Sequence, residues 1–360
     1  MNESYISQNN LENQLKFSLL DCATYEYRPA RYLRHLFFCA HRRLKELYFH
    51  CAKHGAATET EQWIFENYYL LDKLYKGLIV GLRSSVLPHS GKLPDVYRMI
   101  GFFLQCRYEW STKGMMEAVD LFETIRLLTN YEFDHLKSAL QIMAILQIDH
   151  IVQNGDSDGF MKYCFDLLFQ IDQIDFEAVI RTKNHLERIY QDDPSKYYNK
   201  MDINTKRIYR DKTSKSAILQ NINEIELAKS YILQAKEAGE DNPKYRHVGW
   251  YIYGNYRESK GNLVQQAYLP CQVLLPLVFA VIPALWSGAW WIIFLLYFPA
   301  WEILKPIISA AFLRLGYTEY TPRLRDSKEN LEEGKTLVTV SVMLSGIADI
   351  APLSEHLKKL

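Results

Sequence analysis

A charge-free run constrains this chain more than any other feature of its sequence. No Asp, Glu, Lys or Arg occurs between Lys260 and Glu302, and residues 269–301 are almost wholly apolar. One transmembrane helix needs about 20 residues at a rise of about 1.5 Å per residue, so the run is too long for one crossing. Two crossings fit better, with a break at Pro283 or at Ser287–Gly288.

Aromatic and basic residues around this run predict its orientation. Three tryptophans, Trp286, Trp290 and Trp291, would lie at the far membrane interface. Basic residues occur on both flanks, namely Lys244, Arg246, Arg257 and Lys260 before the run and Arg314, Arg323, Arg325 and Lys328 after it. The positive-inside rule places such flanks in the cytoplasm. The sequence therefore predicts transmembrane or interfacial helices over residues 261–314, with the N-terminal region and the C-terminus both cytoplasmic.

The second crossing contains charged residues. A full span must continue from Ala289–Trp301 through Glu302, Lys305 and Pro306. Glu302 and Lys305 are three residues apart and can pair on a helix, but a charged pair in hydrocarbon is costly. An interfacial helix over residues 299–314 is an equal alternative, and the number of crossings stays open.

Helical periodicity dominates residues 1–260. Apolar side chains recur at helical spacing, or helices are plausible, over Tyr32–His50, Trp63–Leu82, Val96–Cys106, Met115–Leu128, His135–Gln153, Gly159–Gln170, Phe176–Tyr190 and Ala217–Ala238. Breaker-rich stretches separate several of these segments, and no β-alternation is visible among them. Lys244–Arg257 is aromatic and basic, as a membrane-interface segment is. We predict a mainly α fold in which residues 1–260 form a cytoplasmic helical region.

Composition excludes some classes of partner and compartment. The 42 basic and 42 acidic side chains balance, so charge gives no reason to expect nucleic acid as a partner. Six cysteines contain no C-x-x-C pair, which fits reduced thiols rather than a disulfide framework. The N-terminus lacks the basic and apolar regions of a secretory signal peptide.

The C-terminal part changes character. Residues 315–335 read as a polar linker, and Thr336–Leu344 is the only convincing strand, β-branched and continuous as in a buried parallel sheet. A helix is expected from about Ala351. One strand and one helix cannot bury their faces, so we expect residues 336–360 to be the start of a truncated α/β domain.

Several segments resemble the bacterial cyclic β-1,2-glucan synthases. Asp193–Arg210, DPSKYYNKMDINTKRIYR, is similar to the family pattern DPxxxYxxMDxxTRxxYR, and His247–Ile252 is similar to HVGYYL. Trp63–Tyr69 resembles the WLLDNYY helix of the family, and Thr336–Leu344 lies where its glycosyltransferase domain begins. The chain departs from the family pattern at Lys206, Ser341 and Glu66, and over Tyr131–Lys137, which lacks the Trp and Pro of the matching helix.

The resemblance carries expectations about function. Members of the family are very large membrane proteins that polymerise glucose from UDP-glucose and then cyclise or trim the product with further domains. The resemblance implies that this chain is the N-terminal scaffold and membrane-anchoring segment in the bacterial inner membrane, catalytically silent alone. Transferase and glycoside-processing domains would be missing or separately encoded, and the donor-binding acidic residues and divalent metal would lie beyond Leu360.

No catalytic, cofactor-binding or metal residue is assigned in this chain. Seven positions match the family signatures without a known role, namely Met201, Asp202, Thr205, Tyr209, Arg210, His247 and Gly249. On physical grounds Asp202 and Thr205 suit a helix N-terminus, while Arg207 and Arg210 could face lipid phosphates, a partner domain or solvent.

Two other patterns suggest metal chemistry weakly. Asp156-Ser157-Asp158 is a D-x-D, which sugar-nucleotide transferases use to hold a divalent cation, but its Gly and Asn neighbours favour an ordinary loop. His50 and His54 lie four apart beside Cys51, yet no third ligand completes a site, so surface histidines explain them more simply.

Two further functions compete with the scaffold interpretation. A free-standing membrane-anchored interaction protein would use the helices to bind a partner and the hairpin only as an anchor. An independent transferase acting through Asp156 and Asp158 is the weaker alternative. The strand at Thr336–Leu344 favours the scaffold, because a self-sufficient binding module has no use for it unless it augments the sheet of a partner.

Overall fold

The computed structural model describes residues 2–83, 85–155, 159–238, 244–256, 261–314 and 323. Within those ranges the chain forms fifteen α-helices and one two-stranded sheet, so the predicted mainly helical class is confirmed. The predicted strand at Thr336–Leu344 and the α/β domain expected over residues 336–360 lie outside the described residues, as does most of the predicted linker.

The first group of helices packs around one long central helix. Its members are α1 (Asn2–Leu19), α2 (Arg31–His54), α3 (Glu59–Gly81), α4 (Asp95–Gln105), α5 (Thr112–Glu123), α6 (Asn130–Asn154), α7 (Phe160–Gln170) and α8 (Phe176–Lys183), with 3-10 turns at Leu20–Ala23 and Ile171–Gln173. Helix α6 contacts α2, α3, α4, α7 and α8 and buries side chains on all of its faces, as a helix at the centre of a domain does.

A second, smaller group forms its own core beside the first. It contains α9 (His185–Tyr190), α10 (Tyr197–Lys200), α11 (Ile203–Gln220), α12 (Glu224–Glu237) and α13 (Val248–Tyr256). Four buried tyrosines, Tyr190, Tyr198, Tyr209 and Tyr231, dominate this core. Helix α11 also contacts α6, so the two groups meet along these helices.

Arg126 connects three parts of the first group. Its Nε donates to the carbonyl of Cys22 at 2.9 Å, and its guanidinium pairs with Asp95 at 3.0 Å and Glu132 at 2.6 Å. Glu132 also completes a capping box with Thr129 at the start of α6. One buried cation therefore joins the N-terminal segment, α4 and the first turn of α6.

A short antiparallel ribbon was missing from the sequence prediction. Strand β1 (Glu26–Pro29) pairs with β2 (Val86–His89), and Tyr27 lies opposite Pro88. From the sequence, residues 87–94 are predicted to be a breaker-rich stretch, which includes most of β2, and no strand is expected before Thr336. Four-residue strands carry almost no alternation signal, and this pairing joins segments that are far apart in the chain.

Two predicted helices are each divided in the structure. Phe176–Tyr190 breaks at Asn184, whose side chain accepts a hydrogen bond from the Glu187 backbone and caps α9. Ala217–Ala238 breaks after Gln220, where Asn221 adopts a left-handed conformation with φ 55° and Asn223 caps α12. Asparagine side chains compete with helical backbone hydrogen bonds, which explains both interruptions.

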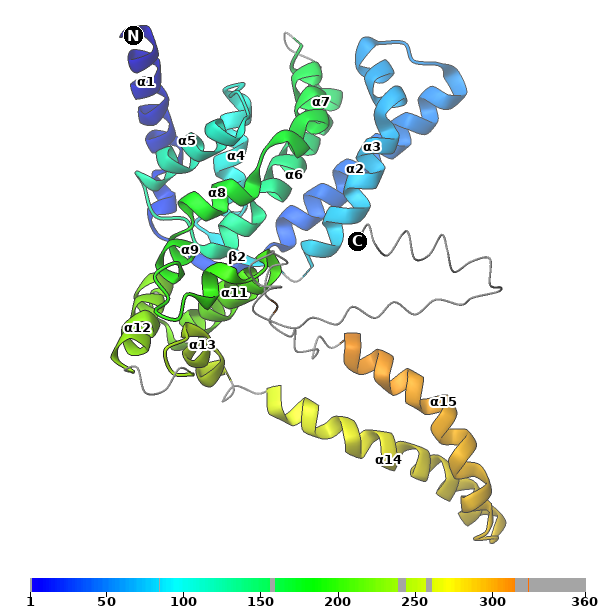
Figure 1. Cartoon of the computed structure of the whole chain (residues 1–360). Helices are drawn as coiled ribbons and strands as arrows, with labels where there is room; N and C mark the ends of the chain where they lie inside the picture. Colours follow the sequence, from blue (N-terminus) through cyan, green and yellow to red (C-terminus); the bar gives the residue numbers. More distant parts are fainter. Residues whose placement is uncertain are drawn as a thin grey trace, which may run out of the picture.

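Helices α14 (Gly261–Ser287) and α15 (Ile292–Arg314) form a hairpin that extends away from the other helices (Figure 1). The segments Ala267–Ser287 and Ile292–Phe312 are long and apolar enough to cross a membrane. Their connection lies at the predicted Ser287–Gly288 break, where Gly288 has φ 70°. Helix α15 is continuous through residues 299–314, so no separate interfacial helix begins there.

Polar contacts join the two arms of the hairpin near its open end. The Tyr268 hydroxyl lies 3.1 Å from Ser309 Oγ and accepts a hydrogen bond from Gln272 at 2.6 Å. The tryptophans predicted for the far interface lie around the turn, where Trp286 is 97% exposed. An exposed apolar surface of this extent indicates contact with lipid or with another protein.

Candidate functional site

The signature positions lie on or just before α11 and α13, and Tyr209 and His247, 38 positions apart in the chain, contact each other. Met201, Thr205, Tyr209 and Arg210 are buried along the first turns of α11 and just before it. His247 and Gly249, at the start of α13, lie against Tyr209. The two sequence signatures are therefore two sides of one contact.

A hydrogen-bonded chain runs through this contact. Asp193 Oδ2 lies 3.0 Å from His247 Nδ1, and His247 Nε2 lies 3.2 Å from the Tyr209 hydroxyl. Because a carboxylate only accepts, Nδ1 carries the ring proton and Nε2 accepts from Tyr209. Asp193 Oδ1 also accepts from the Val248 backbone at 3.0 Å. One carboxylate thus orients the histidine and caps the start of α13.

The environment of Asp193 favours its ionised form. Burial alone would raise the pKa of this carboxyl, but hydrogen bonds from His247, Ser195 and the Val248 backbone outweigh burial and lower it. For Tyr209, burial raises the pKa of the hydroxyl well above its ordinary value. The hydroxyl therefore stays protonated and serves as a hydrogen-bond donor.

The arrangement differs from that of a nucleophilic triad. In a Ser-His-Asp triad the carboxylate and the hydroxyl use opposite nitrogens of the imidazole. Here Ser195 Oγ lies 3.1 Å from His247 Nδ1, the same nitrogen that faces Asp193, while the other nitrogen contacts a buried tyrosine. This geometry positions α13 against α11, and it leaves Ser195 on the protonated nitrogen that also faces Asp193, where the imidazole cannot take the Ser195 proton.

Gly249 makes the close approach of the two helices possible. A Cβ atom at this position would lie 2.5 Å from the Tyr209 hydroxyl and 2.7 Å from His247 Nε2. Both distances are too short for any side chain, so residue 249 has to be glycine for the hydrogen-bonded chain to form.

Arg210 lies on another face of α11 and is only 4% exposed. Its guanidinium pairs with Glu187 of α9, and its Nε donates to the Asn130 side chain at 3.0 Å. Glu187 also accepts from Tyr198 at 2.7 Å and from Lys206 at 3.2 Å. Burial tends to raise the pKa of Glu187, but the two cations and Tyr198 lower it. Arg210 therefore faces neither lipid nor solvent, in contrast to the sequence-based possibility.

The N-terminus of α11 binds the chain that returns from the hairpin. Asp202 caps the helix as predicted, because its side chain accepts from the Thr205 backbone at 2.9 Å. The Asp202 backbone N–H donates to the Arg323 carbonyl at 3.1 Å. Thr205 does not cap the helix; its Oγ1 instead accepts from the Arg323 backbone at 2.9 Å.

The other candidates from the sequence have simple surroundings. His50 and His54 are exposed with ring centroids 4.9 Å apart, and in the described part of the chain no group of three potential metal ligands forms. Arg207 is largely exposed and pairs with Asp134 at 3.1 Å. Asp156 and Asp158 lie outside the described residues.

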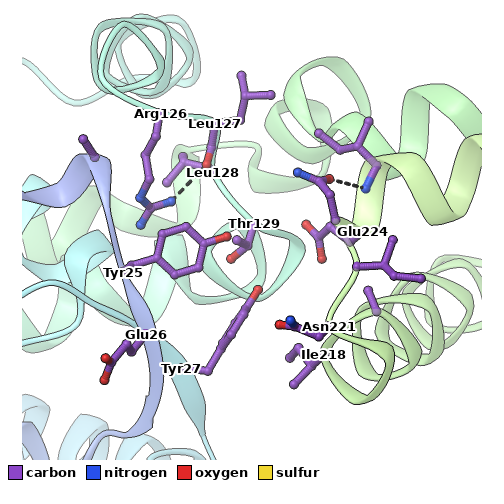
Figure 2. A pocket seen from close by; sticks show the side chains of 15 residues that line it. Tyr25, Glu26, Tyr27, Arg126, Leu127, Leu128, Thr129, Ile218, Asn221 and Glu224 are labelled. Carbon is purple, nitrogen blue, oxygen red and sulfur yellow. Dashed lines mark hydrogen bonds between the residues drawn. The ribbon is translucent and has the colours of Figure 1, made fainter.

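An open cavity of about 650 Å³ lies between β1, the α5–α6 connection and the α11–α12 turn. Figure 2 shows Tyr25 and Tyr27 on one side of it and Asn221 and Glu224 on the other. Glu224 accepts from Ser214 and from the Asn130 backbone, and Arg126 is bound as described above. The ionic groups that line the cavity already have protein partners. The groups that a ligand could contact there are the rings of Tyr25 and Tyr27 and the amide of Asn221.

Sequence reasoning missed Glu187 and Asn130, which hold Arg210. Neither residue belongs to a motif, and both lie far from Arg210 in the chain, so no local signal identifies them. Comparisons of the chain with family models, with curated proteins and with solved structures give no match. The roles given to Asp202, Thr205, Tyr209, Arg210, His247 and Gly249 follow from their contacts, and Met201 is buried beside them.

Replacing Gly249 by Ala should loosen α13 from α11. The added methyl would meet the Tyr209 hydroxyl and His247, so we expect a loss of about 1–3 kcal/mol, as for overpacking. Thermal unfolding in detergent, followed by tryptophan fluorescence, measures this loss. The matched control is Gly254→Ala on the same helix, which meets nothing within 4 Å and should be neutral or slightly stabilising. Equal behaviour of the two variants would contradict the close contact.

Asp211 should make stability depend on pH. Burial, together with the nearby charge of Asp134, raises its pKa from 3.8 to about 6. The native state therefore holds a proton that the unfolded chain has released, and stability falls as pH rises from about 4 to about 6.

Asp211→Asn removes this penalty and can keep the hydrogen bond from Asn130. We expect a gain of about 1–2 kcal/mol at pH 7.5, after allowing for solvent screening, and almost none at pH 4. Urea unfolding at the two pH values tests this. A variant less stable than the parent at pH 7.5 would show that the carboxylate is stabilising.

Proposed function

We propose that this chain is a membrane-anchored helical scaffold, in which the helical region holds a two-span hairpin by both of its ends at the cytoplasmic face of a bacterial inner membrane. The finer part of the proposal is that it serves as the N-terminal segment of a cyclic β-1,2-glucan synthase-like protein. The intact protein would use UDP-glucose and a divalent metal, and this segment would be catalytically silent.

The observation that carries the proposal is the double attachment of the hairpin to α11. The chain enters α14 from α13, which is fixed to α11 through His247 and Tyr209. It returns from α15 to Arg323, whose backbone binds Asp202 and Thr205 at the N-terminus of α11. A flexible tether needs neither contact. A scaffold that sets the position of its anchor needs both.

The surface of the hairpin supports membrane insertion. Large apolar side chains are exposed along both arms, among them Phe279 at 63%, Leu285 at 65% and Phe294 at 82%. In water such a surface would be unfavourable, whereas lipid tails satisfy it. Basic residues flank the open end of the hairpin, and the positive-inside rule assigns that end to the cytoplasm.

The resemblance supports the finer part of the proposal. Its two most specific segments, Asp193–Arg210 and His247–Ile252, contact each other through residues that both segments supply. Matching motifs that form one structural contact argue for a shared scaffold. The matching motifs do not identify a reaction. Glucan synthesis would take place in other domains, which this chain would hold at the cytoplasmic face, where UDP-glucose is available.

Cysteine labelling in intact bacterial cells tests the topology. Cys106 is exposed on the helical region and Ser287 is exposed at the hairpin turn. A membrane-impermeant maleimide should modify the Ser287→Cys protein at the new position in intact cells, whereas Cys106 should react only after permeabilisation. The protein should also resist alkaline carbonate extraction. Labelling of Cys106 in intact cells, or release by carbonate, would contradict the topology or the insertion respectively.

Membranes prepared from the same cells test whether this chain is catalytically silent. Supplied with labelled UDP-glucose and Mg²⁺, membranes that contain this chain but no other glucan synthase should form no polymer. Polymer that disappears in the Asp156→Asn, Asp158→Asn variant would instead establish the chain as an independent transferase.

A further inference from the structure

Seven exposed residues of α2 recur every three or four positions, so they lie along one face of the helix. The buried residues Leu33, Phe37 and Leu44 lie on the opposite face and belong to the core. At about 1.5 Å per residue the exposed face is about 33 Å long. We call it the α2 stripe, and its members are Arg31, His35, Phe38, Arg42, Lys45, Phe49 and Lys53.

The α2 stripe is strongly basic. Four of its seven side chains are Lys or Arg, and none is acidic. Arg42 Nε lies 3.8 Å from Glu46 Oε1, but both side chains are largely exposed, so this pair adds little. Within the described part of the chain, Arg31, Lys45 and Lys53 form no ion pair. The stripe therefore keeps a net positive charge that the described residues do not neutralise.

Two aromatic rings lie between the basic side chains of the stripe. Phe38 is 50% exposed and Phe49 is 54% exposed, although the outward face of a surface helix usually carries polar groups. Exposed phenylalanine combined with Lys and Arg is typical of helices that lie on an anionic membrane. There the rings enter the interface and the cations bind lipid phosphates.

Nucleic acid also binds cations and aromatic rings, but its attraction to a protein depends on an excess of basic residues. This chain has 42 basic and 42 acidic residues and therefore no overall attraction for a polyanion in solution. A membrane needs no such attraction, because the hairpin would hold the helical region beside the lipid surface. Figure 1 shows that the α2–α3 pair and the α14–α15 hairpin both extend to the right of the other helices. The inference therefore rests on the membrane anchor proposed above.

We propose that the α2 stripe binds the anionic lipid headgroups of the membrane that holds the hairpin. Its four Lys and Arg side chains contact lipid phosphates, and its two phenylalanine rings enter the interface. The helical region then has a second attachment to the bilayer, far from the hairpin in the sequence. This attachment restrains the tilt of the helical region relative to the membrane.

A fluorescent probe on the stripe tests the contact in the full chain. Cys39, Cys106 and Cys271, the cysteines that are not buried, are replaced by Ser, and Phe49→Cys is labelled with NBD. The protein is reconstituted into vesicles of phosphatidylcholine, with or without added phosphatidylglycerol, that contain a nitroxide-labelled lipid. NBD emission should shift to shorter wavelength and be quenched in the anionic vesicles only. Added NaCl should reverse both changes, because salt screens the attraction between the stripe and the headgroups.

Charge reversal on the stripe should remove the contact. Arg42→Glu with Lys45→Glu should lower the ratio of lipid-bound to lipid-free α2 by at least about tenfold, because two attractive charges become repulsive. The matched control is Lys162→Glu with Lys229→Glu, which changes the net charge equally on exposed positions of α7 and α12. The control should leave quenching unchanged. The salt dependence is measured without charge reversal, so that part of the test does not rely on the folding of these variants.

Carbonate washing of the vesicles separates the two levels of the proposal. A chain that stays in washed anionic vesicles without quenching of the probe would overturn the α2 contact alone. Equal quenching in neutral and anionic vesicles would overturn the role of the basic side chains. Release of the parent chain by carbonate would overturn the proposed anchor, and this inference with it.

Discussion

The placement of the hairpin depends on the hydrogen bonds that the buried carboxylate of Asp193 accepts from the start of α13. The carboxylate binds the His247 ring and the Val248 backbone with its two oxygens, and His247 in turn binds Tyr209. These bonds fix the first turn of α13 against α11, and α14 is the next described helix along the chain. Loss of the carboxylate would leave the Val248 amide and the His247 ring without their acceptor.

Buried charge holds the supporting helices in one arrangement. Glu187 and Arg210 are 3% and 4% exposed in their side chains, and Asn130 connects the pair to the start of α6. Removing one partner of such a pair costs about 3–5 kcal/mol, because the other charge stays buried without compensation. Apolar packing alone would tolerate sliding between α9 and α11. The directional bonds of Arg210 fix their register, and this register determines where Asp193 and Asp202 lie.

The features that were predictable from sequence are those with a local signal. The absence of charge defined the hairpin, Ser287–Gly288 marked its turn, and an acidic residue before a helix identified the Asp202 cap. The β1–β2 pairing, the Glu187–Arg210 pair and the contact of Gly249 with Tyr209 join residues distant in sequence, and none leaves a periodic pattern. Asn221 was placed inside one predicted helix, whereas its left-handed conformation and the Asn223 cap divide that helix in two.

Hydrogen exchange in the full chain embedded in vesicles tests the double attachment most directly. The Val248 and Arg323 amides, bound to Asp193 and Thr205, report the two ends of the hairpin. Both should exchange as slowly as amides within α11, and Thr205→Val should release the Arg323 amide selectively. Exchange of both amides at the rate of an unstructured peptide, with α11 still protected, would show that the hairpin is a free tether and would contradict the scaffold.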